Sequence, residues 1–267
     1  MSEHNPENPS QPATSTPPNR TMDEIGSPSK NLVNFRLFYI ISQLVGIVIV
    51  ILMICWIALH LDGLAWTSNP RVQFNWHPLL MTLGMIFLYG NSILVYRGFR
   101  YARKRPLKLT HASIHAGAFF FTVIALIAVF DSHNLNNPPI PNMYSLHSWV
   151  GLSAVIIFAM QYVVGFVTFL FPQLKEPIRE TVMPAHIFFG LLGFVMAIGA
   201  ALLGLSEKAF FHIKNISELP SEGLLVNCIG TGLIIYGAIV VYLVTDRQYK
   251  REPLPEDAML LTGGNSE

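Results

Sequence analysis

Six long apolar runs constrain this chain more than any other feature of its sequence. Each run reaches the roughly 20 helical residues that are needed to cross a hydrocarbon core. Lipid offers backbone groups no hydrogen-bond partner, and the runs lack the alternating pattern of barrel strands, so we expect helices. The predicted membrane helices are Leu37–Leu59, Pro78–Tyr96, Ala112–Phe130, Ser148–Phe171, Ile187–Leu205 and Gly223–Thr245.

The composition agrees with an all-α membrane protein. Only 12% of the residues are charged and 52% are hydrophobic, whereas a soluble domain carries about 25% charged residues. The net charge of +1 gives no field that would attract nucleic acid, so we expect no nucleic-acid partner. We divide the chain into a disordered cytosolic tail (1–30), a six-helix transmembrane domain (31–246) and a cytosolic C-terminal tail (247–267).

The distribution of basic residues predicts the orientation in the membrane. The N-terminal tail, the loops after helices two and four, and the C-terminal tail together hold 14 of the 17 lysines and arginines. The positive-inside rule therefore places both termini in the cytosol. The sequon that begins at Asn215 then lies on the non-cytosolic side, where glycosylation is topologically allowed.

Four histidines begin helices at two depths. His77 opens the second predicted helix and His147 opens the fourth, both at the non-cytosolic face. His111 opens the third and His186 opens the fifth, both at the cytosolic face. A single histidine near a helix end is usually an interfacial residue, but two depth-matched pairs on four consecutive helices favour cofactor sites between facing helices.

Paired imidazoles suit haem iron better than zinc. Zinc requires a third and a fourth ligand, and no Cys, Asp or Glu lies at these depths. We therefore expect helices two to five to form a four-helix bundle that holds two b-type haems. His115 follows His111 by one turn on the same helical face, so the spacing alone leaves either of them as the cytosolic-side ligand.

Several strings around these histidines resemble the cytochrome b561 family of ascorbate-reducible di-haem membrane proteins. They are Phe74–Pro78, Lys108–His111, Asn142–Trp149 and Met183–His186, within a similarity that runs from the first helix to the sixth. The resemblance implies that His111, and not His115, is a ligand. It pairs His77 with His147 and His111 with His186 as axial ligands of the haem irons.

The resemblance also implies cytosolic ascorbate as the electron donor. Lys104 and Lys108 precede His111 one turn apart, and Arg179 precedes His186, so three cations gather beside the cytosolic haem. Such a cluster would bind a monoanion, although ordinary positive-inside charge is the alternative. The expected enzyme is a transmembrane ascorbate-dependent oxidoreductase that passes electrons to monodehydroascorbate or ferric iron, as a ferrireductase or monodehydroascorbate reductase.

The loop between helices three and four resembles the acceptor site of that family. It carries no Lys or Arg and offers Phe130, His133, Asn134 and Tyr144. His133 is the candidate contact for a ferric ion. A loop histidine that merely faces solvent is the alternative.

Two weaker signals concern location and assembly. Glu256–Leu261 resembles an acidic dileucine sorting signal, which favours an endosomal, lysosomal or secretory-vesicle membrane, with the plasma membrane as the alternative. Gly84, Gly165 and Gly190 would allow close helix approach inside one bundle or in a homodimer. The rival to the oxidoreductase is a non-catalytic transporter or scaffold whose histidines are structural.

Overall fold

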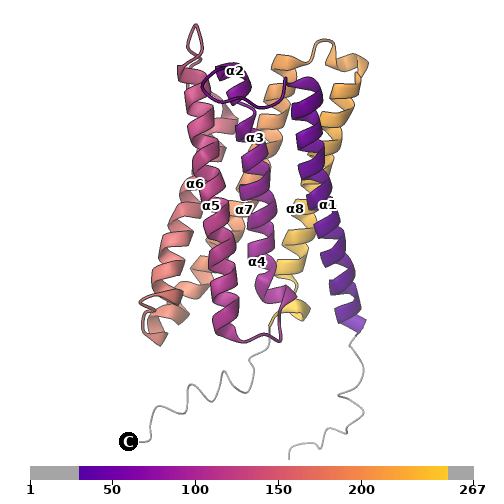
Figure 1. Ribbon diagram of the computed structural model, residues 1–267. Helices are drawn as coiled ribbons and strands as arrows, with labels where there is room; N and C mark the ends of the chain where they lie inside the picture. Colours follow the sequence, from indigo (N-terminus) through magenta and orange to yellow (C-terminus); the bar gives the residue numbers. More distant parts are fainter. Residues whose placement is uncertain (1–29, 252–267) are drawn as a thin grey trace, which may run out of the picture.

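The chain folds into six helical spans, each long and apolar enough to cross a membrane (Figure 1). The structure is a computed structural model that describes residues 30–251. The predicted tail 1–30, most of the predicted tail 247–267 and the string Glu256–Leu261 lie outside the described residues. The prediction of an all-α protein with six membrane helices is confirmed.

The second span is built from several short helical segments, whereas the other spans are nearly continuous. Its segments are α2 (Pro70–Gln73), α3 (Trp76–Met81), the π-helical segment η2 (Thr82–Leu88) and α4 (Tyr89–Gly98). The other spans are α1 (Lys30–His60), α5 (Lys104–Asn134), α6 (Leu146–Gly165) with the π-helical segment η3 (Phe166–Leu170), α7 (Glu176–His212) and α8 (Ser221–Thr245). Two short 3-10 helices, η4 (Ile216–Glu218) and η5 (Arg247–Tyr249), precede and follow α8.

The helices pack as neighbouring pairs. The second span packs on α5, α6 packs on α7, and α1 packs on α8, while η2 also touches α7. Helices two to five therefore form the expected four-helix bundle, and α1 and α8 lie against one side of it (Figure 1). We call the end where α1 begins and α8 ends the basic end, because α4 finishes and α5 starts there among most of the arginines and lysines; the other is the opposite end.

All six spans begin earlier than the sequence predicted, and the difference matters most for the helices that carry His111 and His186. We expected His111 and His186 at helix starts, but α5 begins at Lys104, about two turns before His111, and α7 begins at Glu176, about three turns before His186. The apolar runs end where charged residues appear, yet charged residues of good helix propensity continue a helix past the hydrocarbon core. A proline in the first turn, Pro177 in α7, is compatible with such a start.

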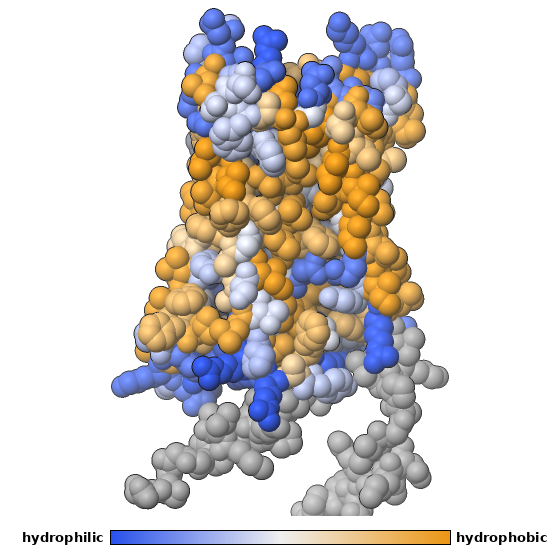
Figure 2. Space-filling model, in the orientation of Figure 1, coloured by the Kyte–Doolittle hydropathy of each residue, from blue (hydrophilic) through white to orange (hydrophobic). Residues whose placement is uncertain are grey.

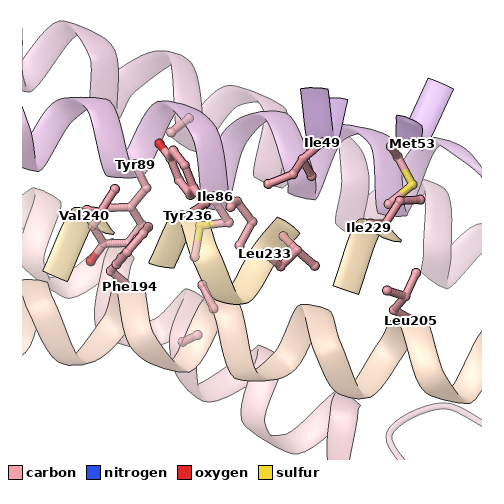
Figure 3. Close-up of a cluster of buried hydrophobic side chains, with 14 of the residues drawn as sticks. Ile49, Met53, Ile86, Tyr89, Phe194, Leu205, Ile229, Leu233, Tyr236 and Val240 are labelled. Atoms are coloured by element: carbon pink, nitrogen blue, oxygen red, sulfur yellow. The ribbon is translucent and has the colours of Figure 1, made fainter. Parts of the chain in front are cut away.

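Hydrophobic side chains from four spans fill the side of the bundle that faces α1 and α8 (Figure 3). Tyr236 of α8 donates a hydrogen bond to the carbonyl oxygen of Phe87 (3.1 Å), and Tyr89 of α4 donates to that of Gly190 (2.8 Å). Such packing and interhelical hydrogen bonds are what hold helices together in lipid, which is as apolar as the side chains themselves. On the face shown in Figure 2, apolar side chains cover the middle and hydrophilic ones gather at the ends.

The predicted close-approach glycines act inside the bundle at two of three positions. A Cβ atom at Gly84 would lie 3.0 Å from the carbonyl oxygen of Ala118 on α5. At Gly165 it would meet His186, whereas at Gly190 nothing lies within 4 Å. The homodimer stays a prediction.

Asn75 fastens the loop that joins α1 to the second span. Its side-chain amide is 2% exposed and donates hydrogen bonds to the carbonyl oxygens of Leu61 and Gly63, both at 2.7 Å. These bonds fix the turn immediately before the helix that carries His77.

Replacing this amide tests how firmly the turn is held. We expect Asn75→Ala to destabilise the protein by about 1–3 kcal/mol, because two carbonyl groups lose their donor. Thermal unfolding in detergent, followed by tryptophan fluorescence, measures the effect. Asn69→Ala is the control, since Asn69 is exposed in the same loop and makes no capping side-chain hydrogen bond; equal melting temperatures for the two variants would contradict the assignment.

Candidate functional site

The bundle brings the four predicted histidines together as two pairs. At the opposite end His77 of α3 faces His147 of α6, with ring centroids 6.0 Å apart and ring planes at 88°. Nearer the basic end His111 of α5 faces His186 of α7, with centroids 6.3 Å apart and planes at 71°. Each pair therefore has one ring from the second span or α5 and one ring from α6 or α7.

Backbone carbonyl groups orient three of the four rings. Because a carbonyl oxygen only accepts hydrogen bonds, each of these rings carries its proton on Nδ1, which leaves Nε2 free to bind a metal. The accepting carbonyl groups belong to Ala125 for His77 (3.3 Å), Ser92 for His111 (2.9 Å) and Ala200 for His147 (2.7 Å). Nδ1 of His186 is buried and has no hydrogen-bond partner among the described residues.

Two glycines make room for rings from the neighbouring helix. A Cβ atom at Gly204 on α7 would lie 2.6 Å from Cε1 of His147, and one at Gly165 on α6 would lie 2.8 Å from Cε1 of His186. Carbon atoms do not approach this closely, so any side chain at either position would displace the ring. No sequence pattern marks Gly204 as part of the site, because its role depends on how α6 packs against α7.

His115 lies beside a pair and not within one. Its ring is 4.5 Å from that of His111 and perpendicular to it, and it packs against Tyr89 (5.0 Å) and Phe158 (5.4 Å) toward the middle of the bundle. His115 is 8% exposed, and its Nδ1 has no partner within the described part of the chain. This placement suits packing near the His111 pair better than a role as its ligand.

The three predicted donor-site cations lie near the His111 pair. Lys108 is close enough to Lys104 and Arg179 for the three positive charges to interact. The Lys108 ammonium donates to the carbonyl oxygen of Phe169 (2.9 Å), whose ring lies 5.3 Å from that of His186. Nε of Arg179 is buried without a partner among residues 34–251. Three like charges beside one another favour an anionic ligand.

The predicted acceptor residues divide into two groups at the opposite end. His133 is close enough to His77 for an electrostatic interaction, and its Nδ1 lies 3.0 Å from Oδ1 of Asn142. Asn142 in turn donates to Oδ1 of Asn134 (2.8 Å). The structure thus adds Asn142 as the residue that orients His133 and leaves the other ring nitrogen available.

Tyr144 takes a different partner. It donates a hydrogen bond to the carboxylate of Glu207 on α7, and burial together with this neighbouring charge raises the pKa of Tyr144. Phe130 lies on α5 and is 37% exposed. Four predicted acceptor residues are therefore at one end of the bundle, but only His133 and Asn134 belong to one hydrogen-bond network.

The opposite end also carries charges that our sequence analysis did not include. Lys208 on α7 places its ammonium 4.6 Å from the ring centroid of Phe74, and that ring lies 6.1 Å from the ring of His77. The predicted apolar run ended at Leu205, so Lys208 and Glu207 were read as loop residues. Because α7 continues to His212, they lie about one turn after Gly204 on the same helix, which the sequence pattern did not indicate.

The fold and these pairs define a class, a multi-pass membrane protein with paired histidines at two levels of a four-helix bundle. Comparison with known proteins identifies the family: residues 76–212 match the model of eukaryotic cytochrome b561, and the chain belongs to that family. It is 42% identical over 222 residues to the plasma membrane ascorbate-dependent reductase CYBRD1 of Xenopus tropicalis, covering 82% of this chain and 77% of that protein. It is 40% identical over 232 residues to the transmembrane ascorbate-dependent reductase CYB561 of Mus musculus, covering 84% and 91%.

Membership of this family implies haem. Among residues 34–251 no three His, Cys, Asp or Glu side chains are grouped as a metal site would require. The histidines are grouped in pairs, and a pair of imidazoles suits haem iron better than a structural zinc ion, which takes four ligands.

Proposed function

We propose that this protein carries electrons from cytosolic ascorbate, through one haem on His111 and His186 and a second on His77 and His147, to a non-cytosolic acceptor. The acceptor is monodehydroascorbate or ferric iron. The observation that carries the proposal is the presence of two facing histidine pairs, one toward each end of the same bundle. The relatives named ascorbate-dependent reductases support the choice of donor.

The spacing of the rings fits a metal between them. A metal–imidazole nitrogen bond is about 2.0–2.1 Å long, so two rings on opposite sides of one metal have centroids about 6 Å apart. The separations of 6.0 Å and 6.3 Å match this value. Bound in this way, haem supplies one-electron oxidation and reduction with no open coordination position.

The residues of the chain hold the ligands ready in advance. The carbonyl groups of Ala125, Ser92 and Ala200 fix three rings with Nε2 free, and Gly204 and Gly165 seat the rings of His147 and His186. Ligands that are oriented before the cofactor binds lose little conformational freedom on binding.

At the basic end the cation cluster would bind and orient the donor. Ascorbate is a monoanion at neutral pH, and Lys104, Lys108 and Arg179 supply the positive charge beside His186. If the basic end is cytosolic, as the positive-inside rule predicts, an electron moves outward from a negative compartment. That direction is favourable by about 2.3 kcal/mol per 100 mV of membrane potential.

An optical difference spectrum of purified protein, oxidised against ascorbate-reduced, tests the proposal first. We expect a b-type α-band and two haems per chain, because there are two ligand pairs. A scaffold whose histidines are structural would show no spectral change with ascorbate. One haem per chain, or reduction by dithionite alone, would contradict the proposal.

The glycines that make room for the rings, Gly204 for His147 and Gly165 for His186, allow the two proposed haem sites to be perturbed separately. Gly204→Ala should displace His147 and lower the haem content from two toward one, and Gly165→Ala should do the same at His186. Gly199→Ala is the control, because Gly199 lies on the same helix as Gly204 and a Cβ atom there would have no neighbour within 4 Å. Pyridine haemochrome analysis and the midpoint potential of the remaining haem measure the outcome; identical spectra for Gly204→Ala and Gly199→Ala would argue against ligation by His147.

The donor site is tested by removing its charges. Lys108→Gln and Arg179→Gln should slow reduction by ascorbate about tenfold or more, since charge-assisted hydrogen bonds contribute about 1.5–3 kcal/mol. Stopped-flow spectroscopy with ascorbate and with dithionite separates docking from haem binding. Arg105→Gln is the matched control, an exposed cation in the first turn of α5. Equal slowing with both reductants would assign these residues to folding.

A further inference from the structure

Lys208 belongs to the stripe of α7 that faces the outer histidine pair. Ala200, Gly204 and Lys208 follow one another at intervals of four residues and so share one face of the helix. Ala200 accepts the hydrogen bond from His147, and Gly204 seats the ring of the same histidine. Lys208 is therefore one turn beyond the seat of His147, toward the opposite end.

Phe74 links Lys208 to the other histidine of that pair. Its ammonium lies 4.6 Å from the centroid of Phe74, whose ring contacts that of His77 with centroids 6.1 Å apart. Lys208 belongs to α7, whereas Phe74 and His77 belong to the second span. These contacts put one positive charge next to the pair at the opposite end.

Within the described part of the chain, no carboxylate forms an ion pair with this ammonium. Lys208 forms no hydrogen bond or ion pair with any residue between 34 and 251, and its only close contact of this kind is the Phe74 ring. Glu222 acts on it electrostatically, but that carboxylate already accepts a hydrogen bond from Trp56 (2.8 Å) and lies 3.6 Å from His212. Glu207 is engaged by Tyr144.

A half-buried ammonium without an ion-pair partner can still bind an anion. It carries three hydrogen-bond donors, and a cation–π contact stabilises it by only about 0.5–2 kcal/mol. Burial against an aromatic ring removes part of its water, which strengthens its attraction for an anion. His133, whose Nδ1 lies 3.0 Å from Oδ1 of Asn142, offers its other ring nitrogen at the same end.

We propose that Lys208 is an anion-binding residue of the outward acceptor site, which holds a carboxylate or other oxyanion of the acceptor beside the pair His77 and His147. The inference rests on the proposed function, since it concerns the electron's exit. One electron reduces one acceptor: a ferric chelate becomes ferrous with no proton, and the monodehydroascorbate anion takes up one electron and one proton from water. Lys208 selects acceptors by charge.

The test uses the full chain in vesicles loaded with ascorbate, with membrane-impermeant acceptors added outside. Only copies with the basic end inward then contribute. The acceptors are ferricyanide, an anion, and tris(phenanthroline)cobalt(III), a cation, and their reduction is followed optically. Lys208→Gln should lower the second-order rate with ferricyanide about 5- to 20-fold and weaken its dependence on ionic strength. Its rate with the cobalt complex should stay equal or rise, and Lys208→Arg should retain most of the ferricyanide rate.

Lys214→Gln is the matched control, because Lys214 is an exposed lysine at the same end of the bundle. The midpoint potentials and haem content of each variant give a readout apart from turnover. Equal slowing with both acceptors, or a shifted potential of the outer haem with no discrimination by charge, would overturn the proposal by assigning Lys208 to the haem. Unchanged ferricyanide kinetics in Lys208→Gln would overturn the proposed role of Lys208 and leave the proposed function standing. Wild-type vesicles that reduce neither acceptor would overturn the proposed function with it.

Discussion

Each of the four paired histidine rings is positioned by the helix that packs beside its own, and the candidate site depends on this arrangement. The second span packs on α5 and α6 packs on α7, and each of these two units gives one ring to each level. Within a unit the partner helix supplies a carbonyl group or a glycine seat for the ring; the pairs are His77 with Ala125, His111 with Ser92, His147 with Ala200 and His186 with Gly165. The spacing between facing rings is thus set by helix packing.

The two levels share this construction but differ in electrostatics. At the basic end three cations gather around Lys108, and their mutual repulsion is relieved only by an anion. At the opposite end the Lys208 ammonium interacts electrostatically with the carboxylate of Glu222, which already accepts a hydrogen bond from Trp56. On the proposed function, the larger positive charge at the basic end would suit a donor that must dock, and the smaller one at the opposite end an acceptor that must leave once reduced.

The spans and the pairing of histidines could be predicted from the sequence, because apolar runs and their charged ends carry strong signals. Helix starts at the basic end could not, since the third apolar run begins at Ala112 although the helix begins at Lys104. The groups that orient the histidine rings could not be predicted from the sequence either. A backbone carbonyl group such as that of Ala200 leaves no residue-type signal, and Gly204 is recognisable as a seat only once α6 lies against α7. The assignment of haem ligands stays a prediction that this geometry supports.

The groups that position the histidine rings differ in kind from the polar groups beyond the outer pair, and this difference indicates where relatives can differ. Glycines and backbone carbonyl groups position the rings, and they respond to the cofactor and not to the substrate. The polar side chains beyond the outer pair belong to a loop and to a helix end, among them His133, Asn142, Tyr144 and Lys208. Loops and helix ends accept substitutions without repacking the bundle. On the proposed function, a change of acceptor would require changes only in these outer residues and would leave the paired histidines in place.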